Sequence, residues 1–336
     1  MQNAVSLKPY NTFGIDVKAA RFTEISNVEE LKLVLRDQYH TGDPLLILGG
    51  GSNVLFSGDF NGLVIRNKIG GIDIIREDSD YIYVRAGAGI VWHQFVLYCI
   101  EHGFAGVENL SLIPGNVGAG PMQNIGAYGV ELKDTFHELE ALKISDLQQR
   151  TFTKEECAFG YRESVFKKEL KGQYIITSVT FKLSKHPVFQ TTYGAIQQEL
   201  ERMGVKELSI KAISDAVINI RRSKLPDPAI LGNAGSFFKN PEIPQRQYEE
   251  VKEKYPALVA YPASPGNMKV AAGWLIEQCG WKGKRVGNTG SHKDQALVLV
   301  NYGGASGEEI YNLALEISKS VKQKFGIEII PEVNVI

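Results

Sequence analysis

Ser236 has the local sequence expected of a reactive hydroxyl group. It follows Gly235 and precedes Phe237 and Phe238, a setting that can present a hydroxyl in a dry pocket. The motif is not a GxSxG elbow, because Phe238 replaces the second glycine, so an esterase is a weak interpretation. A lone loop serine is otherwise explained by a local turn hydrogen bond, and taken by itself Ser236 favours that explanation.

Two charged residues are further candidates for chemistry. Arg162 stands beside Tyr161 and Glu163, and its guanidinium group could bind a substrate carboxylate with two hydrogen bonds. The alternative is a surface ion pair. Glu332 follows Pro331 near the end of the chain, where it is either a solvated strand residue or an acid held beside a site. The sequence alone favours solvation for Glu332.

The segment 114–129 is the most unusual stretch of the chain. Five of its 16 residues are glycine, two are proline and none is charged. Such a loop presents backbone N–H donors without side-chain bulk, which suits a diphosphate or the edge of a flat heterocycle. A plain surface loop would be shorter and would carry charges. We therefore predict a ligand-binding loop.

A second glycine-rich segment, 49–53, follows a predicted buried strand at 45–48. The backbone N–H groups of this segment, the Ser52 hydroxyl and the Asn53 side-chain amide are suited to binding phosphate. It fits neither nucleotide fingerprint, because Val54 stands where GxGxxG requires glycine and no GK[ST] follows. The spacing of Gly115, Gly118 and Gly120 is wrong as well. Any nucleotide is therefore predicted to bind a fold other than the Rossmann or P-loop type.

Length and composition restrict the class of protein. At 336 residues the chain predicts two or three domains, and 43% apolar with 22% charged residues indicates a folded protein. A net charge of −1 argues against nucleic-acid and membrane-surface binding. With no long apolar run and no apolar signal core, a cytoplasmic location is expected. The three separated cysteines predict reduced thiols, and the histidine spacing predicts no metal site.

The hydrophobic periodicity and the positions of glycine and proline predict an α+β protein that becomes more helical after residue 185. Asn27 and Glu30 form a predicted capping box, and the helix after them has Leu31, Val34 and Leu35 on one face. The closing segments 327–330 and 333–336 are predicted as a strand interrupted by Pro331. Other strands are predicted at 21–25, 63–65, 72–75, 81–84, 136–144, 150–153 and 174–183 (with period-2 alternation), and helices at 91–101, 214–222, 270–279 and 307–324.

Taken together, the motifs closely resemble the UDP-N-acetylenolpyruvoylglucosamine reductase family of bacterial flavoenzymes. They occur in the family's order and cover nearly the whole chain. Residues 191–194 and the surrounding segment resemble the longer subfamily, in which a tyrosine loop closes over the substrate. The matching segments are 11–14, 49–53, 113–115, 123–129, 159–164, 232–241 and 331–333.

The resemblance implies an α+β fold with a two-subdomain FAD-binding region of the vanillyl-alcohol-oxidase (PCMH) type and a C-terminal α+β substrate-binding domain. The implied boundaries are 1–67 and 68–207 for the two FAD-binding subdomains, with the tyrosine-loop insertion at about 185–207, then 208–328 for the substrate-binding domain and 329–336 for a closing strand that carries Glu332.

The resemblance also implies roles for individual residues. Ser236 would protonate C2 of an enolpyruvyl group, and Arg162 and Glu332 would stabilise the enolate. Contacts to substrate or nicotinamide nucleotide are implied for Tyr161, Tyr193, Lys224, Asn240 and Gln295. Non-covalent FAD would bind Gly49, Gly50, Gly51, Ser52, Asn53, Gly115, Gly118, Ala119, Gly120, Gln123, Asn124, Ile125, Gly126, Ala127 and Tyr128.

Two positions depart from the pattern of some family members. Gly50 stands where some have glutamate, and Ala119-Gly120 stands where some have two serines, so backbone groups replace hydroxyl contacts to FAD.

The expected activity is NADPH-dependent reduction of UDP-N-acetylglucosamine-enolpyruvate by a monomeric, cytoplasmic enzyme without nucleic-acid or membrane partners. Two alternatives are another flavin oxidase of the same fold and a non-catalytic homologue. The first would often attach FAD through histidine, cysteine or tyrosine, and the segment 114–129 contains no histidine or cysteine; the second predicts a disrupted Ser236, Arg162 or Glu332.

Overall fold

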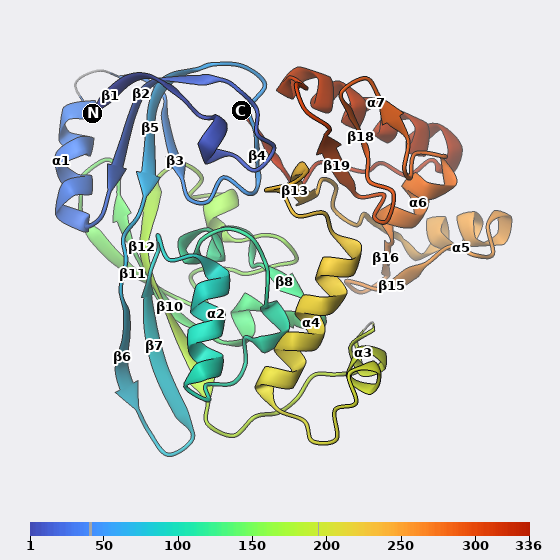
Figure 1. The fold of residues 1–336 in the computed structure, drawn as a ribbon, viewed down its shortest axis with the longest axis horizontal. Helices are drawn as coiled ribbons and strands as arrows, with labels where there is room; N and C mark the ends of the chain where they lie inside the picture. The colour runs from blue at the N-terminus through green and yellow to red at the C-terminus, as the bar shows by residue number, and fades with distance from the viewer. Residues whose placement is uncertain (40–41, 194) are drawn as a thin grey trace. The chain divides into compact units, whose positions relative to one another are not determined.

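The computed structural model describes residues 1–39, 42–193 and 195–336. His40 and Gly194, the latter in the predicted tyrosine loop, lie outside these ranges. The chain divides into two compact units, and Figure 1 shows its path from the N-terminus to the C-terminus. The first unit comprises residues 1–4, 20–50 and 61–223, and the second comprises residues 5–19, 51–60 and 224–336.

The first unit is built on two sheets. The five-stranded sheet is antiparallel throughout. In spatial order it consists of β11 (Gln149–Thr153), β10 (Phe136–Lys143), β12 (Tyr174–Ser184), β7 (Tyr81–Gly87) and β6 (Ile72–Glu77). The four-stranded sheet consists of β1 (Gln2–Ser6), β2 (Lys18–Ile25), β5 (Phe60–Asn67) and β3 (Leu45–Leu48).

Helix α1 (Val28–Tyr39) begins after the predicted cap residue Asn27, but Glu30 bonds to the N–H before that of Asn27, so the predicted capping box is only partly formed. The Asn27 side chain accepts from the Glu30 N–H at 2.9 Å, while the Glu30 carboxylate accepts from the N–H of Ser26 at 2.7 Å. The helix contributes Leu31 and Leu35 to one of the cores. The other buried members of that core are Ile25, Leu63, Ile65, Leu142 and Ile175.

Strand β12 is the central strand of the five-stranded sheet. Its sequence alternates, yet both faces are buried, because β10 and β7 flank it and helix α2 (Trp92–Glu101) packs on it through Phe95 and Phe181, whose ring centroids are 4.6 Å apart. The buried hydroxyl groups remain satisfied: Ser178 donates to the Glu140 carboxylate at 2.8 Å. Alternation in the sequence therefore did not mean a solvent-exposed face.

Two helices complete the first unit. Helix α4 (Ile210–Lys224) begins four residues before its predicted start, because the Ser209 hydroxyl accepts from the Ala212 N–H at 3.1 Å and serves as a cap. Helix α3 (Ile196–Arg202) was not predicted. Ile196 and Leu200 of α3 pack with α4 in a small apolar core.

The second unit holds two small sheets, a strand pair and three helices. One sheet consists of β13 (Gly232–Ser236), β19 (Val298–Asn301), β18 (Thr289–Ser291) and β17 (Arg285–Val286), and the other of β14 (Glu242–Pro244), β16 (Asn267–Val270) and β15 (Ala260–Pro262). The remaining elements are the parallel pair β4 (Val54–Leu55) and β20 (Asn334–Val335), α5 (Gln245–Lys254), α6 (Ala272–Gln278) and α7 (Gly307–Phe325).

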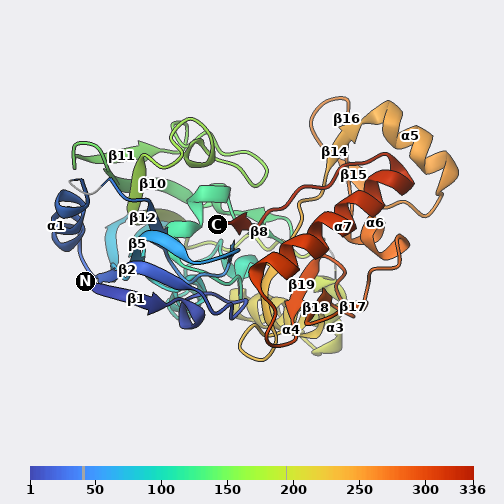
Figure 2. The ribbon, with the colours of Figure 1, turned by 90° about the horizontal axis from the view of Figure 1, so that it is seen from above.

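Helix α7 confirms its prediction closely. Ser306 and Glu309 form a reciprocal capping box, and Gly326 ends the helix with φ of 67°. One apolar face of α7 is buried, and Figure 2 shows α7 beside α6 and the strands β18 and β19. The buried residues of that face are Ile310, Leu313, Ala314, Ile317 and Val321.

Three predictions for the second unit are corrected by the structure. The segment 232–241, predicted as a loop, begins with β13. The helix predicted at 270–279 begins at Ala272, because Val270 belongs to β16. The residues 327–330 do not form a strand; instead Pro331 makes a single antiparallel bridge with Phe238.

No helix in the described part of the chain is both long and apolar enough to cross a membrane.

Gly307 allows the first turn of α7 to approach the backbone at Phe56. An added Cβ atom would lie only 1.7 Å from the Phe56 carbonyl oxygen. Alanine normally favours a helix, but Gly307→Ala is expected to lower the free energy of unfolding by about 1–3 kcal/mol because the backbones must separate. Urea unfolding followed by tryptophan fluorescence measures this change.

Gly58→Ala is the matched control, because nothing lies within 4 Å of the Cβ atom it adds. Equal midpoints for the two variants would contradict the close-approach explanation.

Candidate active site

The glycine-rich loop 114–129 of the first unit is packed closely against the segment after β7. The Gly118 N–H donates to the Ala88 carbonyl at 3.0 Å, and the Val117 N–H donates to the Ile90 carbonyl at 2.8 Å. A Cβ atom on Gly118 would lie 2.5 Å from that of Ala88, and one on Gly120 would lie 2.6 Å from the side chain of Leu132. These two glycines therefore allow close packing.

The loop contains the short 3₁₀ helices η3 (Val117–Ala119) and η4 (Pro121–Gln123), and strand β8 (Gly126–Ala127), which pairs with β9 (Val130–Glu131).

Four backbone N–H groups of the first unit are available to a ligand. Those of Gly49, Gly50, Gly115 and Asn116 donate to no other group in the described part of the chain. The two pairs are close: a Cβ atom on Gly50 would lie 3.3 Å from the Gly115 Cα and 2.8 Å from the Asn116 side-chain oxygen. Adjacent unpaired amides form a concavity suited to an anion. A larger residue at 50 would have to displace the Asn116 side chain, whose amide donates to the Gly89 carbonyl at 2.5 Å.

Arg162 is attached to the same loop. Its Nη2 donates to the Gly126 carbonyl at 2.7 Å, and its backbone has φ of 55°, which is uncommon outside glycine. The fully buried Asn124 side chain donates to the Gly160 carbonyl at 3.0 Å and to the Glu131 carboxylate at 3.1 Å. These bonds hold the segment 160–162 against the loop. They also show that the Asn124 side chain is engaged within the protein.

Tyr128 and Tyr193 meet at the end of the glycine-rich loop. Tyr128 has φ of 51° and is followed by Gly129, on which an added Cβ atom would lie 3.3 Å from the Tyr193 Cβ. The Arg221 guanidinium group of α4 lies close enough to the Tyr128 phenol to interact with it electrostatically. Burial raises the pKa of Tyr128 and lowers the pKa of Arg221. A cation with reduced contact to water is therefore placed beside the Tyr128 phenol.

Ser236 is the last residue of β13 in the second unit. It follows a register shift in the pairing with β19, and Gly235 has φ of 70°. The buried Asn233 side chain fixes this turn by accepting from the Gly235 N–H at 2.9 Å. Ser236 is exposed, and its hydroxyl makes no hydrogen bond to another described residue. The structure therefore does not support the local turn hydrogen bond as the reason for this serine.

The segment that carries Glu332 pairs with the residues after Ser236. The Glu332 N–H donates to the Phe237 carbonyl at 2.7 Å, and the Lys239 N–H donates to the Ile330 carbonyl at 3.1 Å. The Glu332 carbonyl accepts from Asn53 at 3.4 Å. Ser236 and Glu332, 96 positions apart in the sequence, are thus brought to neighbouring backbone positions in one unit.

The remaining predicted residues of the second unit fall into three places. The Asn240 side chain accepts from the first N–H of α6, on Ala272, at 2.9 Å, and the Gln295 side-chain oxygen would lie 3.3 Å from a Cβ atom on Gly273. Asn240 and Gln295 therefore meet at the first turn of α6. Lys224 is exposed. Gly51, Ser52 and Asn53 form the start of the second unit's segment 51–60.

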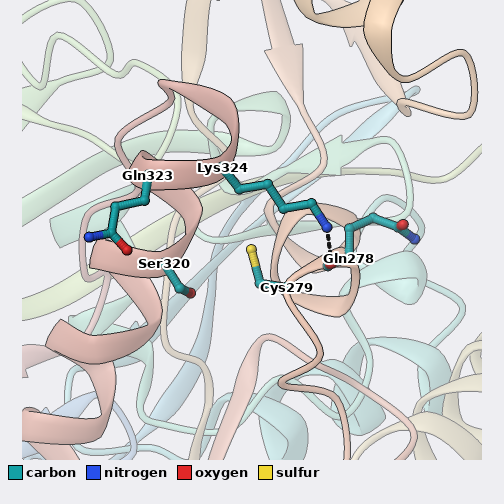
Figure 3. A pocket seen from close by; sticks show the side chains of 5 residues that line it. All are labelled: Gln278, Cys279, Ser320, Gln323 and Lys324. Carbon is teal, nitrogen blue, oxygen red and sulfur yellow. Dashed lines mark hydrogen bonds between the residues drawn. The ribbon is translucent and has the colours of Figure 1, made fainter.

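A hollow of about 330 Å³ in the second unit contains none of the predicted site residues (Figure 3). Cys279 lines it, and burial raises the pKa of this thiol. All three cysteines are free thiols, as predicted. Within the described ranges, no cluster of three or more His, Cys, Asp or Glu could hold a metal ion. The lining residues are Gln278, Cys279, Ser320, Gln323 and Lys324.

Sequence reasoning missed two residues that contact the predicted site. Arg221 precedes the predicted Lys224 by one helical turn, a spacing that could have drawn attention to it. Asn109 is 1% exposed and donates to the Tyr128 carbonyl at 3.0 Å. Nothing in the surrounding sequence marks Asn109 as different from an ordinary loop asparagine.

Two protein-family models match the chain. Residues 19–146 match an FAD binding domain, and residues 227–336 match the UDP-N-acetylenolpyruvoylglucosamine reductase C-terminal domain. These matches cover the glycine-rich segments and the segment from β13 to Glu332.

Curated relatives are similar over the full chain. The UDP-N-acetylenolpyruvoylglucosamine reductase of Flavobacterium johnsoniae is 52% identical over 338 residues, covering 100% of this chain and 99% of the relative. That of Pseudomonas aeruginosa is 47% identical over 334 residues, covering 99% and 98%. The crystal structure of UDP-N-acetylenolpyruvylglucosamine reductase from Thermus caldophilus is 25% identical with a TM-score of 0.68, covering 98% of this chain and 97% of that one.

These similarities confirm the predicted α+β fold with an FAD-binding domain and a C-terminal domain. They confirm the family resemblance as well. With about half of its residues identical to curated members along its entire length, the chain belongs to the UDP-N-acetylenolpyruvoylglucosamine reductase family.

Proposed function

We propose that this chain reduces the enolpyruvyl group of UDP-N-acetylglucosamine-enolpyruvate to give UDP-N-acetylmuramate, with FAD and NADPH, in the synthesis of peptidoglycan precursors. The observation that carries the proposal is the 52% identity to a reductase of this name along the whole chain. The presence of Ser236, Arg162 and Glu332 supports an active member of the family over a non-catalytic homologue.

The chain offers FAD a suitable donor set. The N–H groups of Gly49, Gly50, Gly115 and Asn116 donate to no other described residue, and none of these four residues is charged. Such amides suit the diphosphate of the cofactor. When bound, FAD supplies the hydride that it takes from NADPH. We assign the predicted residues of segments 49–53 and 115–128 to its binding.

Ser236 is proposed as the proton donor for C2 of the enolpyruvyl group. Addition of hydride at C3 places negative charge toward the substrate carboxylate, and a proton must then reach C2. A serine is a weak acid in water, so a cation must stabilise its alkoxide; Arg162 and Lys239 are the proposed cations. The unpaired Ser236 hydroxyl is free to bond to substrate, which supports this role.

Arg162 and Glu332 are proposed to stabilise the enolate. A guanidinium group held by the Gly126 carbonyl is already oriented before the charge develops, which is the condition for electrostatic catalysis. Contacts to the rest of the substrate, or to the nicotinamide nucleotide, are proposed for Tyr161, Tyr193, Lys224, Asn240 and Gln295.

The remaining proposals concern organisation and location. We propose that the enzyme is a monomer acting in the cytoplasm, without nucleic-acid or membrane partners. The domain boundaries at residues 67, 207 and 328 stay a prediction. Gel filtration with light scattering tests the monomer, for which the expected mass is 37.1 kDa.

Ser236→Ala is expected to separate the two half-reactions. Flavin reduction by NADPH should stay within about twofold of wild type, since that step needs no proton at C2. Reoxidation by the enolpyruvyl substrate should slow by about 10²–10⁴, the usual contribution of a general acid. Stopped-flow absorbance of the flavin measures both rates.

The control is Ser264→Ala, a serine on the surface of the second unit whose hydroxyl contacts Glu242. Both of its half-reactions should match wild type. Equal slowing of both half-reactions in Ser236→Ala would refute the assigned role, and failure of the wild-type flavin to reoxidise with this substrate would refute the proposed reaction.

Gly118→Ala is expected to weaken FAD binding. The added Cβ atom would lie 2.5 Å from the Ala88 Cβ and 3.1 Å from the backbone of Ala88, so the loop must move away. An overpacking cost of about 1–3 kcal/mol would raise the dissociation constant about tenfold or more. Titration of the apoprotein with FAD, followed by flavin fluorescence, gives that constant.

Gly70→Ala serves as the comparison, because the nearest atom to its added Cβ is 4.0 Å away. If both variants bind FAD as tightly as wild type, the close packing at Gly118 does not support the cofactor site.

A further inference from the structure

We infer that Asn109 is a positioning residue, which holds the segment carrying Tyr193 onto the end of the glycine-rich loop and so sets the affinity for the enolpyruvyl nucleotide. The inference rests on the proposed function for its effect on catalysis. Its structural basis lies wholly within the first unit.

Asn109 joins two segments that are distant in the sequence. It lies in the 3₁₀ helix η2 (Glu108–Leu110) and is 1% exposed. Its Nδ2 donates to the Tyr128 carbonyl at 3.0 Å and to the Gln190 carbonyl at 2.9 Å. An amide nitrogen has two hydrogens, so these two bonds use its whole donor capacity.

The segment 187–193 depends on this side chain for its polar contacts. None of its residues makes a backbone–backbone hydrogen bond within the described ranges, and the bond from Asn109 is the one hydrogen bond that it shares with other described residues. Phe189 adds an apolar contact with the core of α3 and α4. Segments with so few internal bonds open readily, so loss of one buried bond should have a large effect on their position.

The two hydrogen bonds of Asn109 hold the two segments that contact each other at Gly129 and Tyr193. Tyr128 directly precedes Gly129, on which an added Cβ atom would lie 3.3 Å from the Tyr193 Cβ. Gln190 precedes Tyr193 by three residues. The Tyr193 side chain is 51% exposed, so little else fixes its place. Asn109 thus determines how Tyr193 lies over the loop, although it does not touch the reacting atoms.

Asn109→Leu tests the inference, because leucine has a similar size and cannot donate. The KM for UDP-N-acetylglucosamine-enolpyruvate should rise about tenfold, as expected from loss of the buried hydrogen bond that holds the Gln190 carbonyl, while kcat stays within about threefold. The limiting rate of flavin reduction at saturating NADPH and the FAD content should match wild type. Cleavage by chymotrypsin after Phe189 or Tyr193 of the FAD-bound enzyme, identified by mass spectrometry, should be at least about tenfold faster.

Ser111→Ala is the matched control. Its hydroxyl donates to the Glu108 carbonyl and contacts Ser214 at 2.8 Å, so it supports the same turn without contacting either joined segment. This variant should lose stability while keeping the wild-type KM and cleavage rate. If Asn109→Leu fails to fold, Asn109→Ser replaces it, because a hydroxyl has one proton and cannot satisfy two carbonyl groups.

The outcomes separate the inference from the proposed function. An unchanged KM together with unchanged cleavage, or the same changes in Ser111→Ala, would overturn the positioning role. If the wild-type enzyme does not turn over the enolpyruvyl nucleotide, the proposed function is rejected, and the cleavage rates alone decide whether Asn109 holds the segment.

Discussion

The close approach between the glycine-rich loop 114–129 and the backbone at Ala88 is the constraint on which the first unit's candidate site depends. A methyl group at Gly118 would leave only 2.5 Å between two carbon atoms. Because the loop lies this close, its carbonyl groups and free amides occupy fixed positions. Those positions determine which side chains can bond to the loop: Arg162 donates to the Gly126 carbonyl, and Asn109 donates to the Tyr128 carbonyl.

In the second unit, backbone hydrogen bonds between distant segments position the candidate site residues. Backbone bonds between 237–239 and 330–332 join two segments that regular periodicity does not describe. Proline at 331 restricts this contact to a single bridge, while Gly235 turns the chain just before Ser236. An unpaired hydroxyl at the end of a strand is therefore a consequence of the register shift between β13 and β19. Strand β13 holds Ser236 in place, and the irregular turn at Gly235 exposes it.

The sequence predicted the features that depend on local patterns. The Asn27 cap and the apolar face of α1 and the extent of α7 follow from neighbouring residues, and the structure confirms them. Strand β13 was missed because two glycines within five residues normally oppose a strand, and pairing with β19 overcomes that preference. The family motifs pointed to Ser236, Arg162 and Glu332, whereas Asn109 could not be found, because its role requires knowing that residues 128 and 190 are adjacent in space.

Buried asparagine side chains bond to irregular backbone in both units. Asn11 bonds to three backbone groups between residues 7 and 15, Asn233 fixes the turn before Ser236, and Asn301 joins the Phe13 carbonyl to two amides after β19. One carbonyl and two N–H hydrogens allow an asparagine to replace the partners that irregular backbone lacks. An irregular segment can be buried only if its amides and carbonyls are satisfied, so loops that must shape a ligand site need such side chains. Asn109 extends this arrangement to the segment 187–193, which makes no backbone–backbone hydrogen bond to another described residue, and this is why its amide has more influence there than an additional bond would have in a sheet.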